Sequence, residues 1–218
     1  ITSLKVTGPL NGDDIRFIRE MAGVDIYGNT TEGQLTILNI GEASIVEGGS
    51  SYRYGTEFTE NDIIGDHMFD QTILKQVFLP DGVTSIGEWA FENCSSLTLI
   101  DIPDDVTSIG YGAFSNCSSL TSINIPNGVT EIGGWTFWRC YSLTSIEIPD
   151  GVTSIGERAF QYCNLLSEVT CDATTPPTLG SNAFYDIASS PTLYVPISCS
   201  TAYSESDWAQ YFTTIEEK

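Results

Sequence analysis

The sequence predicts a solenoid, a fold in which short repeats stack on one continuous core. Between Pro80 and Cys171, four copies of one 23-residue unit follow one another. Self-similarity at a fixed period of this size is typical of solenoids, because one unit is too small to bury its own apolar side chains. The repeated positions are a Pro, an Ile followed by Gly, a Phe and a Cys: Pro80, Pro103, Pro126 and Pro149; Ile86, Ile109, Ile132 and Ile155; Phe91, Phe114, Phe137 and Phe160; and Cys94, Cys117, Cys140 and Cys163.

One strand is expected in each unit. Leu120, Ile123 and Ile125 follow a Leu-x-x-Ile-x-Ile spacing. Alternate residues of a strand point to opposite faces, so Ile123 and Ile125 should face inward and Asn124 outward. Pro126 ends the strand because it has no N–H to give to a neighbouring strand. Since the units are in register, their strands should pair as one parallel sheet, with about eight strands in the whole chain.

The chain must then return to the start of the next coil. After Pro126 the return passes Val129, Ile132 and a Gly, and we expect a short helical turn that contains Phe137. The Gly is expected to give a bend or a close backbone approach that a side chain would block. The Phe is expected to fill the centre of each coil. The predicted fold class is therefore an α/β solenoid with a 23-residue repeat, capped at both ends.

Residues 1–62 are less regular and are predicted to form an N-terminal cap with a helix and irregular repeats. Strand-like spacing occurs around Leu4 and again around Leu38. Between them we expect a helix, because Asn11 or Asp13 can cap its start and Gly23 can end it. Residues 41–62 are polar and Gly-rich, and we expect a long surface loop there. The expected apolar stripe of the helix consists of Ile15, Phe17, Ile18 and Met21.

The repeats are predicted to occupy residues 63–171, beginning with a degenerate unit around Phe69. Residues 172–218 are predicted to hold a final divergent repeat, with a strand at Leu193–Val195, and a C-terminal cap. Such caps are expected because the end coils of a solenoid would otherwise expose their core. The C-terminal cap is expected to be one helix whose aromatic side chains cover the last coil: Tyr203, Trp208, Tyr211 and Phe212.

The repeat resembles a known family. The segment SLTSINIPNGVTEIGGWTFWRC is similar to the BspA-type (Treponema-type) leucine-rich repeat of bacterial surface proteins. The segments GDDIRFIREMAG and TTPPTLGSNAF also resemble the flanks that such domains carry in gut Bacteroidetes. The resemblance implies a leucine-rich-repeat fold, an extracellular or outer-surface location and a role in adhesion or protein binding.

The charge balance limits the kind of partner. The formal net charge is −21, with 29 acidic and 8 basic residues. Nucleic-acid binding needs the opposite sign, and anionic membrane surfaces are disfavoured for the same reason. No apolar run approaches the length of a membrane span, so no membrane insertion by this segment is expected. The acidic surface is expected to keep a monomer in solution. A calcium site at residues 101–105 is not expected, because the spaced oxygen ligands of a calcium loop are missing.

The chain starts at Ile1 and contains no signal peptide. We expect that it has been trimmed, so the lack of a signal peptide says little about the location of the native protein.

The cysteines are expected to be free and buried. Cys94, Cys117, Cys140 and Cys163 form a ladder with one thiol per coil, and stacked Cβ atoms would lie too far apart for a disulfide. Zinc is not expected, because a straight ladder does not converge tetrahedrally. Cys171 occupies an inward strand position. The alternative of a disulfide between Cys171 and Cys199 stays open.

No signature of an enzyme or a cofactor occurs in the sequence. The only histidine, His67, takes a variable turn position that we expect to be exposed, and no nucleophile motif lies near it. No phosphate-binding loop is present. We therefore expect a protein that is not an enzyme and that needs no cofactor or metal.

Two surfaces remain as candidate binding sites, and for each a purely structural explanation is also open. Outward strand positions should form the concave face, the usual binding surface of a repeat protein, or only a solvated sheet. Large aromatics at the convex turns are able to stack on a glycan, or simply pack between neighbouring turns. The concave candidates are Phe78, Leu99, Asp101, Asn124, Glu147 and Thr170, and the turn candidates are Trp89, Tyr111, Trp135 and Trp138.

The expected function is that of a rigid recognition or adhesion scaffold. A protein ligand bound through the concave face is the first hypothesis. Glycan binding through the aromatic turns and a passive spacer within a larger surface protein are the alternatives. The fold does not decide among them.

Overall fold

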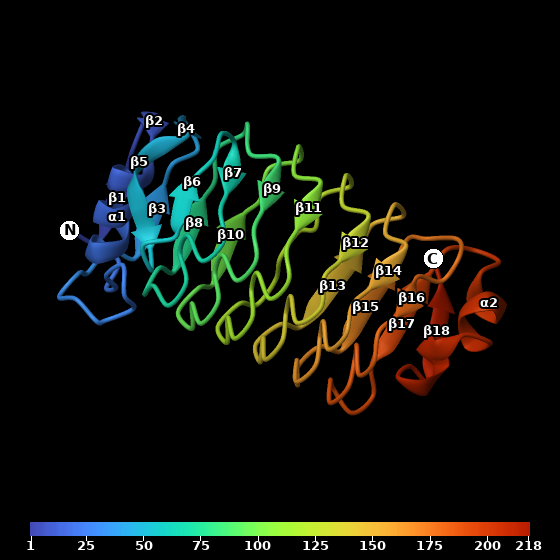
Figure 1. Ribbon diagram of the computed structural model, residues 1–218. Coiled ribbons are helices and arrows are strands. Elements are labelled where there is room, and N and C mark those ends of the chain that lie inside the picture. Colours follow the sequence, from blue (N-terminus) through green and yellow to red (C-terminus); the bar gives the residue numbers. More distant parts are fainter.

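The strands of the chain form two rows, and most coils contribute one strand to each row (Figure 1). The structure is a computed structural model that describes residues 1–218. All pairings within both rows are parallel, which confirms the predicted solenoid of 23-residue repeats. The helices lie at the two ends of the chain only, so the repeats contain little of the helix that the α/β class implies. None of the helices is both long and apolar enough to cross a lipid bilayer.

The first row contains the predicted strands. Eight strands belong to it, in two four-stranded sheets. Seven of them lie where strands were predicted, the strand at Thr214–Glu217 was not predicted, and the strand predicted at Leu120–Ile125 is missing. Residues 121–126 are not assigned as strand, so the row is interrupted at this coil. The strands are β1 (Ser3–Lys5), β3 (Ile37–Asn39), β8 (Gln76–Phe78) and β10 (Leu99–Asp101), and then β13 (Ser145–Ile148), β15 (Glu168–Cys171), β17 (Thr192–Val195) and β18 (Thr214–Glu217).

The second row is a six-stranded sheet that the sequence analysis did not predict. Each of its strands has only two residues, which is too short for an alternation pattern to stand out. The Gly after the Ile of each strand permits a close approach of neighbouring coils, since a Cβ at Gly110 would lie 2.7 Å from the backbone nitrogen of Glu88. The strands are β7 (Ile63–Ile64), β9 (Ser85–Ile86), β11 (Ser108–Ile109), β12 (Glu131–Ile132), β14 (Ser154–Ile155) and β16 (Thr178–Leu179).

A ladder of stacked phenylalanine rings runs through the core. Phe91, Phe114 and Phe137 are fully buried, with ring centroids 5.4 and 5.7 Å apart and nearly parallel planes. The ladder begins at Phe69 and ends at Phe184. The expected short helical turn at this position is wrong. The Phe114 N–H donates to the carbonyl of Thr136 in the next coil, so a turn bonded between coils replaces the helix.

At the N-terminal end, α1 (Gly12–Met21) confirms the predicted helix. Asn11 caps it by accepting a hydrogen bond from the Asp13 N–H, and the Asn11 N–H donates to Asp14. Ile15 and Ile18 are buried, but Phe17 is 64% exposed. The predicted apolar stripe is therefore only partly correct. Two residues span about 200° of a helix, which turns Phe17 away from the side that Ile15 faces.

The long surface loop expected at residues 41–62 is wrong. This segment holds β4 (Ala43–Ile45), which pairs with β2 (Gly8–Leu10), and an antiparallel hairpin of β5 (Gly48–Arg53) and β6 (Glu57–Thr59). Tyr52 and Arg53 are fully buried. Polar and glycine-rich composition suggested a loop, whereas contacts with α1 make the hairpin part of the fold.

At the C-terminal end, two short helices and a strand replace the single predicted helix. They are α2 (Ser200–Ser204), the 3-10 helix η1 (Asp207–Gln210) and β18, which extends the first row beside β17. Trp208 and Phe212 pack on Phe184, at ring distances of 5.3 and 5.2 Å. Tyr203 is buried and Tyr211 half-buried. The aromatic cover of the last coil is therefore as predicted, although its secondary structure is not.

Candidate functional site

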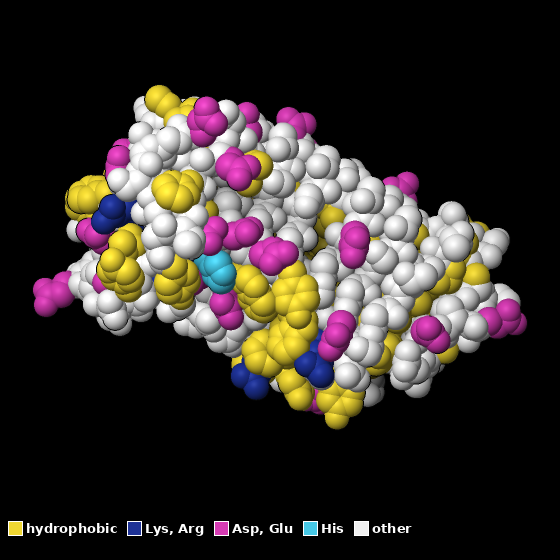
Figure 2. Space-filling model, in the orientation of Figure 1, with side chains coloured by type: hydrophobic (Ala, Val, Ile, Leu, Met, Phe, Trp, Pro, Cys, Tyr) yellow, Lys and Arg dark blue, Asp and Glu magenta, His cyan; other side chains and the backbone are white.

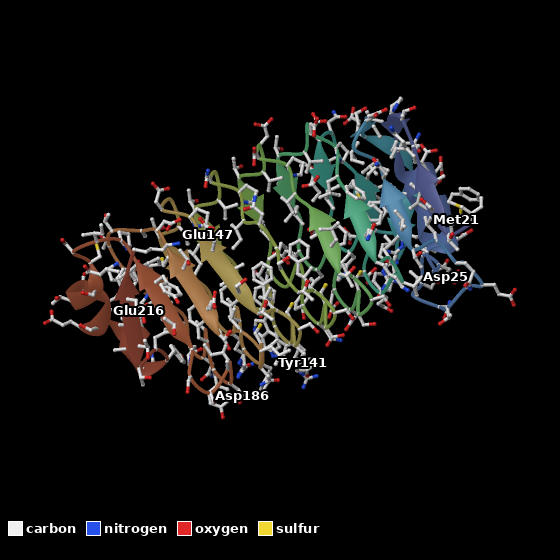
Figure 3. The ribbon with its side chains drawn as sticks, turned by 180° about the vertical axis from the view of Figure 1, so that it is seen from behind. Met21, Asp25, Tyr141, Glu147, Asp186 and Glu216 are labelled. Carbon is white, nitrogen blue, oxygen red and sulfur yellow. The ribbon has the colours of Figure 1, made fainter.

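The outward side of the first row, here called the first-row face, carries the residues predicted for the concave surface. Leu99, Asp101 and Glu147 are exposed, and Asn124 is exposed in the coil that interrupts the row. Phe78 and Thr170 are half-buried. Figure 3 labels Glu147 and Glu216 on strands of this face.

Strand register decides which of these side chains lie together. Phe78 is paired with Asp101, and Glu147 with Thr170. Leu99 is paired with Gln76, so Phe78 and Leu99 are diagonal neighbours rather than direct ones. Because the strands are parallel and in register, outward side chains of successive coils form rows along the molecule. A ligand lying along such a row would touch several coils at once.

The aromatic side chains of the turns pack on one another across coils. Trp89 and Tyr111 lie 5.1 Å apart in an edge-to-face arrangement. Within one turn, Trp135 and Trp138 lie 5.0 Å apart, and Trp138 contacts Tyr162 of the next coil at 6.4 Å. Trp89, Trp135 and Trp138 are half-buried rather than fully exposed, and Tyr111 is 39% exposed. Packing between turns therefore occurs, and it holds the rings in fixed orientations with part of their surface in solvent.

Two arginines stack on these rings. The guanidinium carbon of Arg139 lies 4.0 Å from the ring centroid of Trp138, and that of Arg158 lies 4.9 Å from Trp135. Figure 2 shows a yellow group of hydrophobic side chains flanked by dark-blue cations on this side of the molecule. We call Trp135, Trp138, Arg139, Arg158 and Tyr162 the aromatic–arginine cluster.

The two arginines were not among the site residues predicted from the sequence. A signal was present, because Arg139, Tyr162 and Tyr185 occupy one repeat position at 23-residue spacing. Tyr162 and Tyr185 also pack on each other, with ring centroids 6.2 Å apart.

Several residues of this cluster have an unusual backbone. Trp135, Arg139, Arg158 and Tyr162 all have positive φ angles, between 55° and 66°. This left-handed conformation is uncommon for bulky side chains, because Cβ approaches the following carbonyl oxygen. Other coils place Asn116 at the position of Arg139, and asparagine tolerates positive φ more readily.

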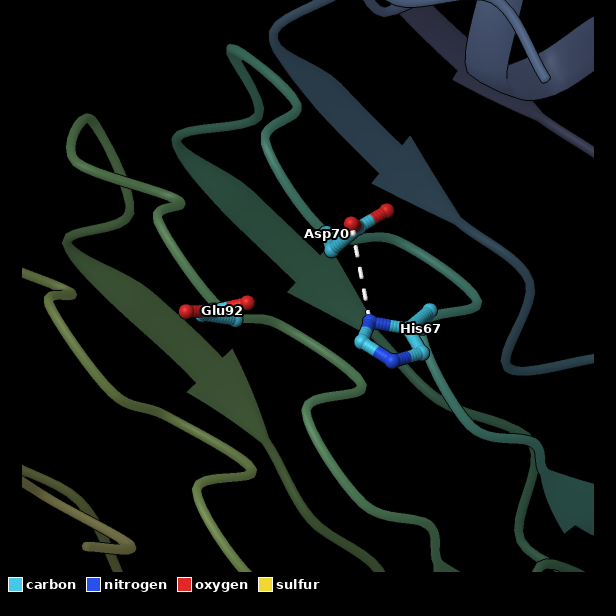
Figure 4. A group of neighbouring side chains, drawn as sticks. All are labelled: His67, Asp70 and Glu92. Carbon is cyan, nitrogen blue, oxygen red and sulfur yellow. Dashed lines mark ion pairs between the residues drawn. The ribbon is translucent and has the colours of Figure 1, made fainter. Parts of the chain in front are cut away.

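A buried ionic cluster joins the N-terminal cap to the first coil. Figure 4 shows Asp70 of this cluster with the neighbouring side chains of His67 and Glu92. Asp70 is held by two buried arginines: its Oδ1 lies 2.9 Å from Arg19 Nη1 of α1, and its Oδ2 lies 2.6 Å from Arg53 Nη2 of β5. Arg19 also donates to the carbonyl oxygens of His67 and Met68. Residues from three separate segments thus meet at one carboxylate.

Burial and charge act against each other on the pKa values of this cluster. Burial raises the pKa of Asp70, but His67, Arg19 and Arg53 outweigh it and hold that pKa below its usual value. Asp70 raises the pKa of His67 above its usual value. Burial raises the pKa of Glu92. His67 Nδ1 lies 3.6 Å from Asp70 Oδ2, beyond a hydrogen bond, so protonation of His67 converts this contact into an ion pair.

Three side chains at this cluster are of types that bind metal ions. One ligand atom each from His67, Asp70 and Glu92 lies within 4.8 Å of the others. Both carboxylate oxygens of Asp70 already face arginine nitrogens, and two buried positive charges oppose a divalent cation at this point. The arrangement therefore fits a structural ion cluster better than a metal centre. His67 is half-buried, in contrast to its expected exposure.

The four cysteines of the ladder are buried, and each thiol donates to a carbonyl of the preceding coil. Cys117 Sγ lies 3.2 Å from the Phe91 oxygen, and Cys140 and Cys163 repeat this contact at 3.3 and 3.1 Å. Burial raises the pKa of the Cys94 thiol to about 12, so the reactive thiolate form is disfavoured. Cys171 accepts a hydrogen bond from the Tyr203 hydroxyl, while Cys199 is half-buried.

The chain is similar to known bacterial repeat proteins. The profile of the BspA type leucine rich repeat region, in 6 copies, matches residues 62–190 and 132–206. Among solved structures, the chain is similar to a leucine-rich repeat protein of Treponema pallidum, with 25% identity and a TM-score of 0.49 over 66% of this chain and 72% of that one.

Two further structures support the fold. A leucine-rich repeat protein of Bacteroides ovatus has 20% identity and a TM-score of 0.50, over 85% of this chain and 55% of that one. The pneumococcal vaccine antigen PcpA has 16% identity and a TM-score of 0.56, over 85% of this chain and 52% of that one. This chain thus spans about half the length of these two relatives. The comparison with curated proteins gave no match.

Proposed function

The chain belongs to the BspA-type leucine-rich repeat family, and from that premise we propose that it is a non-enzymatic scaffold that recognises a protein ligand through its first-row face. The family is one of protein-interaction and adhesion scaffolds. Its resemblance to bacterial surface proteins and the net charge of −21 support an extracellular or outer-surface location. We further propose that the scaffold acts as a monomer.

The register of the first row is the observation that carries this proposal. It aligns outward side chains from both ends of the chain, with Lys5 beside Asn39 at one end and Tyr194 beside Glu216 at the other. Between them Asp101 and Glu147 are exposed acids. An extended polar face of this kind suits a protein surface with complementary basic groups, because charge complementarity speeds association and excludes wrong partners.

Charge reversal on this face tests the proposal. The folded domain is screened against an array of extracellular proteins, and each hit is measured again with Asp101→Lys and Glu147→Lys combined. The control combines Asp104→Lys and Asp150→Lys, which change the net charge equally at exposed turn positions. We expect the first pair alone to lower the association rate and to reverse or weaken its salt dependence. Equal effects of both pairs, or none, would contradict binding at this face.

Glycan binding through the aromatic turns is the second candidate. It is favoured by large rings that packing across coils holds in fixed orientations, such as Trp89 against Tyr111. The expected result is that Trp89→Ala or Trp135→Ala removes a hit on a glycan array while the far-ultraviolet circular dichroism spectrum is unchanged. A passive spacer is what remains if neither array gives a hit.

A further inference from the structure

We propose that the aromatic–arginine cluster binds a carboxylated sugar. This inference rests on the second candidate function and deepens it, because it names the chemical class of the glycan. Two aromatic platforms and two guanidinium groups lie within one group of neighbouring turns. Together they match a ligand that has both an apolar ring face and a negative charge.

The charge of the cluster stands out against the rest of the repeats. Arg139 and Arg158 are the only basic residues between Lys75 and Lys218. Neither guanidinium makes a side-chain hydrogen bond, and the nearest carboxylate to Arg158 is Glu157, at 3.3 Å from its Nε. Two cations without a hydrogen-bonded partner, in a protein of net charge −21, form a local site for an anion.

The unpaired donors of the cluster indicate that its ligand supplies a hydrogen-bond acceptor. Three buried nitrogens have no hydrogen-bond partner: Trp138 Nε1, Arg139 Nε and Arg158 Nε. All three are donors. A guanidinium that lies flat on an aromatic ring keeps an N–H edge free, and that edge matches a carboxylate in a two-point contact. Arg158 Nε lies 3.3 Å from Glu157 Oε1, so Trp138 Nε1 and Arg139 Nε are the two donors with no acceptor nearby. At these two donors the cluster offers hydrogen bonds and positive charge to an acceptor from outside.

The backbone indicates that these side chains are not required by the fold. At the repeat position of Trp135 and Arg158 another coil has Gly112, and at the position of Arg139 others have Asn93 and Asn116. All of these positions have positive φ. Glycine and asparagine adopt this conformation at lower cost than tryptophan or arginine. Residues that keep a strained backbone conformation, where glycine or asparagine would be less strained, are typical of functional sites.

The surface beside the cluster offers polar groups to a sugar. Next to the cluster, a groove of about 380 Å³ is lined by polar residues of β11, β12 and the turns, among them Thr107, Thr130 and Glu131. The groove ends at Tyr111 and Gly134, directly before Trp135 in the chain. Hydroxyl groups of a sugar chain can bond to the polar lining while its rings stack on the aromatic side chains.

The experiment compares acidic sugars with neutral counterparts. Binding of trigalacturonic acid and of its neutral methyl ester to the 218-residue chain is measured by calorimetry, together with sialyllactose against lactose and a hexaglutamate peptide. The variants are Arg139→Asn and Arg158→Gly, which copy residues found at the same positions in other coils. We expect at least one acidic sugar to bind about tenfold more tightly than its neutral counterpart, and each variant to remove most of this difference.

The possible outcomes distinguish glycan binding in general from a preference for a carboxylated glycan. Equal binding of acidic and neutral sugars would overturn the preference for a carboxylate and leave glycan binding in place. Failure of every sugar to bind would overturn both, as would arginine-dependent binding of hexaglutamate alone. Thermal melting serves as the control, and the variants should melt no lower than the parent chain. If a variant unfolds, the comparison of acid and ester on the unmodified chain still decides the question.

Discussion

Asp70 is the residue at which the N-terminal cap and the repeats are joined. Its carboxylate is almost fully buried between Arg19 and Arg53. Two buried guanidinium groups in contact with one carboxylate leave no solvent to compensate a lost charge. The stability of this junction therefore depends on a single negative charge.

We expect Asp70→Asn to lower the free energy of unfolding by about 3–5 kcal/mol, because it leaves two buried positive charges without a counter-charge. Urea denaturation followed by circular dichroism measures this change. Asp81→Asn, at an exposed position, is the control and should have an effect within about 0.5 kcal/mol. Equal stability of the two variants would show that the cluster does not hold the cap in place.

His67 gives the same cluster a pH dependence of known sign. Its pKa is raised in the folded chain by Asp70, so its contribution to stability is fully present below the usual value of 6.5. The contribution is lost as the pH rises through the folded pKa. Asp70, with a lowered pKa, behaves in the opposite way and loses its contribution only in acid.

We therefore expect His67→Asn to destabilise the chain at pH values below the pKa of free histidine and to have little effect at alkaline pH. Asparagine is chosen because His67 has a positive φ of 54°. The measurement is the difference in unfolding free energy between the parent chain and the variant across the pH range. A difference that grows with rising pH would contradict the assigned ion pair.

The repeating element of the fold is a coil closed by one strand of each row and filled by one phenylalanine. Phe114 stacks between Phe91 and Phe137 with interplanar angles of 7° and 4°. Each ring is therefore part of the contact surface of two neighbours. Removing one ring opens a cavity that neighbouring coils cannot close without breaking the strand register.

Phe114→Ala should lower the free energy of unfolding by about 3–5 kcal/mol, the usual cost of a buried phenylalanine. The matched control is Phe58→Ala, since Phe58 is 53% exposed on β6. Thermal and urea melts of both variants give the comparison. An unchanged melt for Phe114→Ala would refute the role of the ring ladder in the core.

For the whole molecule, stability is shared between neighbouring coils rather than concentrated at one centre. The pairing of Ser108 with Ser85 and of Ser154 with Glu131 repeats at the same 23-residue step. A chain shortened by one full step can re-form these contacts between the coils that become neighbours.

We expect deletion of residues 104–126, one full repeat, to leave a folded protein with a cooperative melt at a lower temperature. Deletion of residues 104–115 should instead prevent folding, because it shifts the inward positions of all later coils relative to the earlier ones. Circular dichroism and size-exclusion chromatography measure both. Folding of the half-repeat deletion, or failure of the full one, would contradict the model of interchangeable coils.

The features that were predicted correctly are those that a local pattern encodes. The inward positions of the first row, such as Ile100 and Ile146, follow from alternation within one strand. The capping of α1 by Asn11 follows from the residues of its first turn. The hairpin of β5 and β6 was missed because its segment has the composition of a loop, and only its contacts with α1 give it a place in the fold.

For the candidate binding residues, too, some features follow from a local sequence pattern and others from contacts between coils. The exposure of Asp101 and Glu147 on the first-row face follows from the outward positions of their strands. The stacking of Arg158 on Trp135 joins neighbouring turns, and no single turn contains both partners. A pattern within one repeat does not show which side chains of the next repeat will pack on its aromatic rings.

By itself, the sequence determined the repeat period, the strand register and the residues that form the core, because each of these is set by spacing along the chain. Only the tertiary structure decided the second row of strands, the joining of Arg19 and Arg53 at Asp70, and the stacking of Arg158 on Trp135 in the aromatic–arginine cluster. The physical reason is that these features depend on contacts between residues far apart in the chain, which exist only once the coils have stacked.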